Sequence, residues 1–132
     1  MVNEAFGWIW FVLGMGSGAL LGLGFARESF LGGYGSWERR LLRLGHISFF
    51  GLGLINILFA LSIDRIGLGD PWTPVASWSL IVGGVAMPTC CALAAFHKSA
   101  KSLFAVPVIA LLLGASITAL GLTLGVVGGG VS

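Results

Sequence analysis

The feature that most constrains this chain is a run of twenty residues without a formal charge between Arg43 and Asp64. At a rise of about 1.5 Å per residue, a helix of this length spans about 30 Å, the thickness of the hydrocarbon core of a bilayer. Basic residues precede the run, and the pair Asp64 and Arg65 follows it. The sequence therefore predicts a transmembrane helix at this position.

The composition of the whole chain is typical of a membrane protein. Hydrophobic residues make up 57% of its 132 residues and charged residues only 9%, and the mean hydropathy is +1.01. Soluble domains have fewer apolar and more charged residues than this. The basic residues lie at the ends of apolar segments and form no basic face with interleaved aromatics, so we expect no contact with nucleic acid. The expected partners are the lipid bilayer and other membrane protein subunits.

Four apolar segments are long enough to cross a bilayer, and together they predict the fold. Charged residues, glycines and prolines mark their ends and place the helices at about 4–26, 37–63, 74–96 and 103–127. Asn3, Ser36, Thr73 and Ser102 are suited to cap these helices, and Pro88 predicts a kink in the third. We expect an all-α integral membrane protein, a single domain with four helices in an up-down antiparallel bundle of two hairpins.

The basic residues indicate the orientation of this bundle. Six of the seven lie in or beside the first and third loops, and only Arg65 belongs to the second loop; the six are Arg27, Arg39, Arg40, Arg43, Lys98 and Lys101. By the positive-inside rule, the first and third loops face the cytoplasm and both termini lie outside. The expected location is the inner (cytoplasmic) membrane of the cell, as a multi-pass protein.

Small and polar residues recur at helical spacing along the predicted helices. In a bilayer, small residues at such spacing let two helices approach closely, and an amide side chain bonds to a neighbouring helix. For Asn56 we expect a bond of this kind, with Ser116 or Thr118 as its partner. The residues assigned to helix packing are Gly14, Gly18, Gly22, Gly53, Asn56, Gly114, Thr118, Gly121 and Gly125.

The two histidines, His46 and His97, are the candidate cofactor-binding residues. The topology puts both near the cytoplasmic surface, and the helix face beside His97 carries small side chains. Two axial imidazoles from different helices could hold the iron of a haem b, with basic residues near its propionates. Alternatively, Arg43 and His46 could bind the carbonyl oxygen of a quinone or a lipid head group. In a third interpretation both histidines are structural.

Other side chains give little sign of catalysis. Cys90 and Cys91 are adjacent within an apolar run, which favours buried packing over a disulfide. Cys90 lies about 10 Å from His97 along a helix, so the two do not form a metal site. The apolar spans carry no charged residue at mid-membrane, which argues against a proton pump or coupled transporter acting alone. We expect a non-catalytic protein.

The general plan resembles the small membrane anchors of respiratory and photosynthetic complexes, in architecture alone. The chain has no catalytic constellation and almost no soluble loop, so we expect a small integral membrane subunit of a larger electron-transfer assembly, as an anchor or as a haem- or quinone-associated subunit. Glycine ridges on the first and fourth helices, beyond what one small bundle needs, also favour protein partners. Two alternatives are a cofactor-free accessory packing subunit and a small homo-oligomeric pore.

Overall fold

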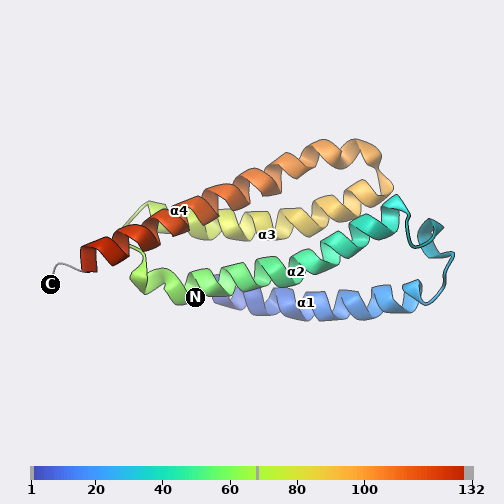
Figure 1. Ribbon diagram of the computed structural model, residues 1–132, viewed down its shortest axis with the longest axis horizontal. Coiled ribbons are helices and arrows are strands. Elements are labelled where there is room, and N and C mark those ends of the chain that lie inside the picture. Colours follow the sequence, from blue (N-terminus) through green and yellow to red (C-terminus); the bar gives the residue numbers. More distant parts are fainter. Residues whose placement is uncertain (1, 68, 130–132) are drawn as a thin grey trace.

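The computed structural model of the chain describes residues 2–67 and 69–129, and its regular structure is entirely helical. The long helices of this described part are α1 Val2–Phe25, α2 Trp37–Ser62, α3 Trp72–Phe96 and α4 Ala105–Gly129 (Figure 1). All four are long and apolar enough to cross a membrane, which confirms the predicted all-α class. Their bounds differ from the predicted ones by at most two residues.

The helices pack in chain order as an open row. α1 lies on α2, α2 on α3 and α3 on α4, and a smaller contact joins α1 to α3 (Figure 1). The most apolar stretch of α3 is 50% buried, whereas the corresponding shares in α1 and α4 are 11% and 17%. α3 is therefore the most enclosed helix, and α1 and α4 form the edges of the row.

The two ends of the row differ in the segments that they carry. The 26–36 loop and the 97–104 turn lie together at one end, which we call the loop end (Figure 1). The 63–71 connection lies toward the opposite end, which we call the terminal end because α1 begins and α4 ends on that side. Nearly all basic residues belong to the loop end.

Three of the four predicted caps, Asn3, Thr73 and Ser102, lie inside helical segments in the structure. The Ser36 hydroxyl caps α2 as expected, because it accepts a hydrogen bond from the backbone N–H of Arg39 at 3.2 Å. Thr73, however, is the second residue of α3 and not the residue that precedes it. Ser102 lies within a 3-10 helix, η3 Lys98–Phe104, which continues the turn before α4 begins. The sequence could not show that the third turn is itself helical.

Pro88 lies inside α3, and a side chain of α1 compensates for its missing N–H. Proline removes the hydrogen bond to the carbonyl four residues earlier, which here belongs to Gly84. The indole N–H of Trp10 donates to that carbonyl at 3.1 Å, and a backbone group freed inside a membrane needs such a partner. α3 is one continuous helix across Pro88. The carbonyl that Pro88 leaves without its helical partner thus provides one of the contacts between α1 and α3.

Candidate functional site

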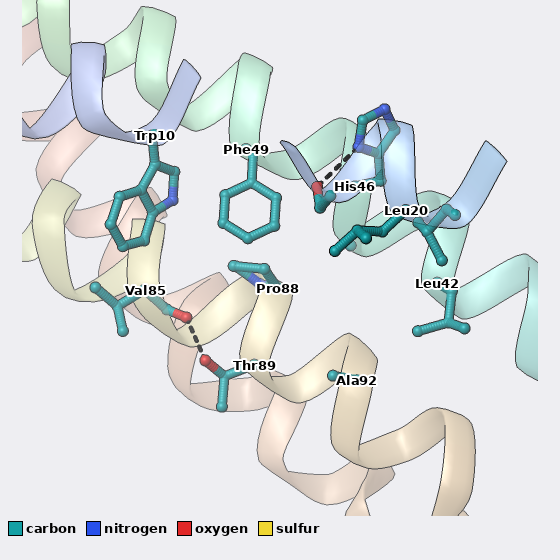
Figure 2. A pocket seen from close by; sticks show the side chains of 12 residues that line it. Trp10, Leu20, Leu42, His46, Phe49, Val85, Pro88, Thr89 and Ala92 are labelled. Carbon is teal, nitrogen blue, oxygen red and sulfur yellow. Dashed lines mark hydrogen bonds between the residues drawn. The ribbon is translucent and has the colours of Figure 1, made fainter. Parts of the chain in front are cut away.

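A groove lies between α1 and α3, with α2 as its floor (Figure 2). It has a volume of about 560 Å³ and extends from Trp10 toward the loop end. The Trp10–Gly84 bond joins α1 to α3 at its inner end, and beyond this bond side chains of both helices form the walls. We call it the α1–α3 groove. It is lined by His46, one of the predicted site residues.

His46 lies between α1 and α2 at the edge of this groove. Its ring rests on Gly18, where a Cβ would lie 2.6 Å from the imidazole Cε1, and meets the Phe50 ring edge-on. The Ser17 Oγ lies 3.2 Å from His46 Nδ1 and 3.0 Å from the Gly14 carbonyl oxygen. Because a carbonyl can only accept, the hydroxyl donates to Gly14 and accepts from Nδ1–H. Neutral His46 therefore keeps its lone pair on Nε2.

Apart from His46 Nε2, the polar side-chain groups that line the groove have partners within the protein. Figure 2 shows the Nε2 of His46 on the side of the ring that faces away from Pro88 and Thr89. The Thr89 hydroxyl donates to the Val85 carbonyl of its own helix at 2.7 Å, and the Trp10 indole is bonded as described above. What the groove offers to a ligand is therefore an apolar surface.

His97 does not lie in the α1–α3 groove. It caps the C-terminus of α3 and is exposed at the loop end. A Cβ on Gly45, the residue before His46, would lie 3.1 Å from the Cβ of Cys91, so these positions are level with each other. His97 follows Cys91 by six residues, about 9 Å along a helix, while His46 lies slightly further toward the terminal end. The structure thus places the two histidines at different levels along the helices, with His46 at the α1–α3 groove and His97 exposed beyond the end of α3.

Arg43 does not join His46 in the groove either. Its guanidinium donates to the Tyr34 carbonyl at 3.2 Å and lies 4.3 Å from the centre of the Tyr34 ring. The predicted pair of Arg43 and His46 for a quinone carbonyl or lipid head group is therefore not assembled. Arg39 is buried, with 4% of its surface exposed, and donates to the Arg27 carbonyl just beyond α1. These two arginines hold the loop end together.

Comparison with known proteins assigns the chain to no family. No family model matches it, and no curated protein and no solved structure is detectably similar to it. Within the described residues, no group of three or more His, Cys, Asp and Glu side chains is placed to hold a metal ion. Function is therefore inferred from the geometry of this chain alone.

A buried polar cluster of Asn3, Asn56 and Ser77 joins α1, α2 and α3. The side-chain N–H of Asn3 donates to the Asn56 Oδ1 at 2.8 Å and to the Ser77 carbonyl at 3.2 Å. The Ser77 hydroxyl donates to the Asn3 Oδ1, and the Asn56 amide donates to the Leu80 carbonyl at 3.4 Å. Asn3 and Asn56 have no exposed surface. Asn3 therefore acts as a helix-joining residue inside α1, and the prediction that it caps α1 is wrong.

The cross-helix bond of Asn56 has different partners from those proposed. The Thr118 hydroxyl donates to the Gly114 carbonyl of its own helix at 2.7 Å. Ser116 is exposed on α4, which is an edge helix. The sequence identifies Asn56 as a residue that needs a neighbour, but the choice of α1 and α3 follows from the packing order.

The glycines assigned to packing have three kinds of neighbour: side chains of an adjacent helix, the 63–67 segment, or no atom of another element. A Cβ on Gly14 or Gly18 would meet side chains of α2 at 3.0 or 2.6 Å, and one on Gly114 would meet α3 at 2.8 Å. Gly22 has no atom of another element within 4 Å of such a Cβ, so it faces no other helix of the described part of this chain. Gly121 and Gly125 lie against the 63–67 segment, where the Gly67 N–H donates to the Gly121 carbonyl at 2.9 Å.

The backbones of α1 and α2 approach each other at Gly7, a packing residue that the sequence pattern did not identify. A Cβ there would lie 2.5 Å from both the Gly53 carbonyl oxygen and the Ile57 Cγ1. Gly53 faces back, with a Cβ position 3.0 Å from the Gly7 carbonyl oxygen. The available signal was the seven-residue spacing from Gly7 to Gly14, which returns to one helix face after about two turns.

The two cysteines are free and buried, as the sequence predicts. The Cys90 thiol donates to the Leu103 carbonyl in η3 at 3.5 Å, which ties the C-terminal half of α3 to the following turn. Cys91 has no exposed surface and lies against Gly45 of α2. Both side chains therefore serve the packing of α3.

Proposed function

We propose that this chain is a multi-pass protein of the inner membrane whose helices cross the bilayer in alternate directions, with both termini outside. The distribution of charge supports this orientation, because six basic residues belong to the loop end and only Arg65 to the second connection. Basic residues near the ends of membrane spans are retained on the cytoplasmic side. The loop end is then cytoplasmic.

Within that membrane, we propose that the chain is a small, non-catalytic subunit of a larger electron-transfer assembly. The observation that carries this proposal is the open row of helices, whose edges are broad and apolar. Leu20 and Leu23 of α1 are 72% and 77% exposed, and Ile109 and Leu112 of α4 are 65% and 63% exposed. A closed bundle would cover more of its helices than this row does. Lipid and neighbouring subunits together are suited to cover these edges.

An anchoring role fits the site better than a cofactor-binding one. The Nδ1 of His46 is bonded to Ser17 and its ring fills the space above Gly18, whereas His97 and Arg43 lie elsewhere. These contacts are those of a structural histidine between two helices. They favour the cofactor-free accessory subunit as the second candidate function, which differs from the first in having no redox partner.

The proposal is tested by purifying the tagged chain from its native membranes in mild detergent. We expect it to migrate with other membrane subunits in fixed stoichiometry, including one that carries a redox centre. Partners without any redox centre would support the accessory subunit. Crosslinking in native membranes that gives only homo-oligomers would contradict both and support a pore.

Histidine variants separate the anchoring role from haem ligation. We expect His46→Ala and His97→Ala to leave the visible absorption spectrum of the purified assembly unchanged, because the two imidazoles do not meet. His46→Ala should instead cost about 1 kcal/mol of stability, the scale of an interhelical hydrogen bond in a membrane. Loss of the same Soret band in both variants would show that the histidines ligate one haem after all.

A further inference from the structure

The Nε2 atom of His46 is an unpaired hydrogen-bond acceptor at the surface of the protein. Ser17 bonds to Nδ1–H, so the lone pair of the neutral ring lies on Nε2, and no group of the described residues donates to it. In this part of the chain, Arg39 Nε is the one buried side-chain nitrogen or oxygen without a partner. The Nε2 of His46 is therefore not buried, and a donor from another molecule can reach it.

This acceptor lies on the side of α1 and α2 opposite the α1–α3 groove. Nδ1 lies toward Ser17, which lines the groove, and Figure 2 shows Nε2 on the side of the ring that faces away from α3. Phe49 lines the groove, whereas Phe50, which meets the His46 ring edge-on, does not. We call the surface on this side the His46 face; its exposed residues beside His46 include Gly22 and Ile47.

The depth of His46 excludes lipid head groups as the donor. His46 lies nine residues after Trp37, the first residue of α2, and so about 13 Å further into the membrane. Tryptophan is typical of the membrane–water interface, and the acyl chains below it carry no hydrogen-bond donor. Arg43, one turn nearer the loop end, is held at Tyr34. An unpaired acceptor in hydrocarbon is costly, which favours a donor from another protein or a small ligand.

The high exposure of the His46 face favours a helix over a small ligand. Ile47 is 63% exposed, and a Cβ on Gly22 would meet no atom of another element within 4 Å. Small ligands bind in pockets that cover most of their surface, whereas membrane helices pack on open faces and approach closely at glycines. α1 is also the least covered of the four spans. This face therefore suits a transmembrane helix.

A second copy of this chain does not supply the missing donor. A two-fold pair through the His46 face would bring acceptor to acceptor. On the other edge of the row, the exposed Ser116 hydroxyl has no partner among the described residues. Cys90 lies near the level of His46, and its thiol bonds to Leu103, two residues before α4 begins. Ser116 follows eleven residues into α4, about 16 Å nearer the terminal end, so it cannot meet His46 of a copy in the same orientation.

We propose that the His46 face is the docking site for a transmembrane helix of a different subunit, whose side-chain hydroxyl donates a hydrogen bond to Nε2 of His46. The inference rests on the proposed function, because it names the surface through which the chain joins its assembly. Nδ1 then holds α2 to α1 through Ser17, and Nε2 binds the neighbour, so one imidazole joins three helices. Such a bond is modest, and packing of exposed apolar side chains such as Ile47 supplies the rest of the contact.

Two substitutions that resemble parts of the imidazole test the bond. His46→Asn keeps an amide donor near the position of Nδ1 but places nothing at Nε2, whereas His46→Gln places an amide oxygen near Nε2. The tagged full chain is purified from native membranes in mild detergent, and the partner retained per chain is quantified by mass spectrometry. We expect His46→Asn to lower retention about threefold to tenfold, as for one hydrogen bond between membrane helices, and His46→Gln to keep most of it. Full retention by His46→Asn would overturn the proposal.

Ser17→Ala is the matched control for the other side of the ring. It removes the bond to Nδ1 and leaves Nε2 in place, so partner retention should stay near that of the unaltered chain. A loss as large as that in His46→Asn would show that the link between α1 and α2 governs docking, which contradicts a bond at Nε2.

Photocrosslinking separates this inference from the proposed function. A photoreactive p-benzoylphenylalanine in place of Ile47 should crosslink to a transmembrane helix of another subunit, with a side-chain hydroxyl at the depth of His46. The same residue in place of Leu112, 63% exposed on α4, should not reach that helix. If subunits co-purify but crosslink from position 112 and not from 47, the docking site is wrong and the proposed function stands. Crosslinks only to copies of this chain would contradict both.

Discussion

Gly7→Leu is expected to lower the free energy of unfolding in detergent by about 3 kcal/mol, the upper end of the range for overpacking. Even a Cβ at this position would lie 2.5 Å from the carbonyl oxygen of Gly53, a backbone atom that cannot rotate away. The substitution therefore forces α1 and α2 apart along their interface. Titration with a denaturing detergent, followed by tryptophan fluorescence, measures the change.

Gly16→Leu is the matched control on the same helix. A Cβ on Gly16 would have no atom within 4 Å outside its own helix backbone and its two chain neighbours, so a leucine there projects into lipid or detergent. Both substitutions replace a helical glycine of α1 by leucine, but only the side chain at position 7 would contact α2. Similar losses for the two variants would mean that α1 and α2 do not approach each other at Gly7.

Asn56→Leu is expected to cost about 1.5 kcal/mol, near the largest values measured for polar contacts between membrane helices. The substitution removes the bond to Asn3 at 2.8 Å and the bond to the Leu80 carbonyl. α2 thereby loses polar links to both α1 and α3. The same unfolding titration measures this loss.

Two further variants test whether the cost comes from the polar cluster. Thr118→Val removes a hydroxyl whose bond stays within α4, and it should change stability by less than about 0.5 kcal/mol. Asn3→Leu combined with Asn56→Leu should cost less than the two single losses together, because the residues share a hydrogen bond. Strict additivity would contradict the cluster.

The positions of the helices could be predicted because they follow from length, charge and hydropathy. The charges at Arg43 and Asp64 and the glycines and prolines of the loops bound each span to within two residues. The need of Asn56 for a partner could be predicted for a similar reason, since an unpaired amide is costly in hydrocarbon. These properties belong to single segments and require no knowledge of their neighbours.

The contacts between helices could not be predicted, because they depend on the order and crossing of the helices. The position of Asn3 at the start of an apolar run predicts a helix cap. In the structure its side chain instead donates a hydrogen bond to Asn56 of α2. Gly22 has the same spacing as Gly14 and Gly18, yet a Cβ there would meet no atom of another element within 4 Å. The groove beside His46 arises where α1 and α3 lie apart across α2. No sequence spacing in one helix encodes that separation.

Accessibility labelling of single cysteines at both ends of the row tests the central claim, a four-span protein with a cytoplasmic loop end. Ser99→Cys and Gly69→Cys place exposed thiols at the loop end and in the second connection, and the buried native cysteines provide the unlabelled baseline. With an impermeant thiol reagent, Gly69→Cys should react in intact cells and Ser99→Cys only after lysis. Reaction of Ser99→Cys in intact cells, with Gly69→Cys protected, would invert the orientation, and reaction of both in intact cells would contradict alternate crossing.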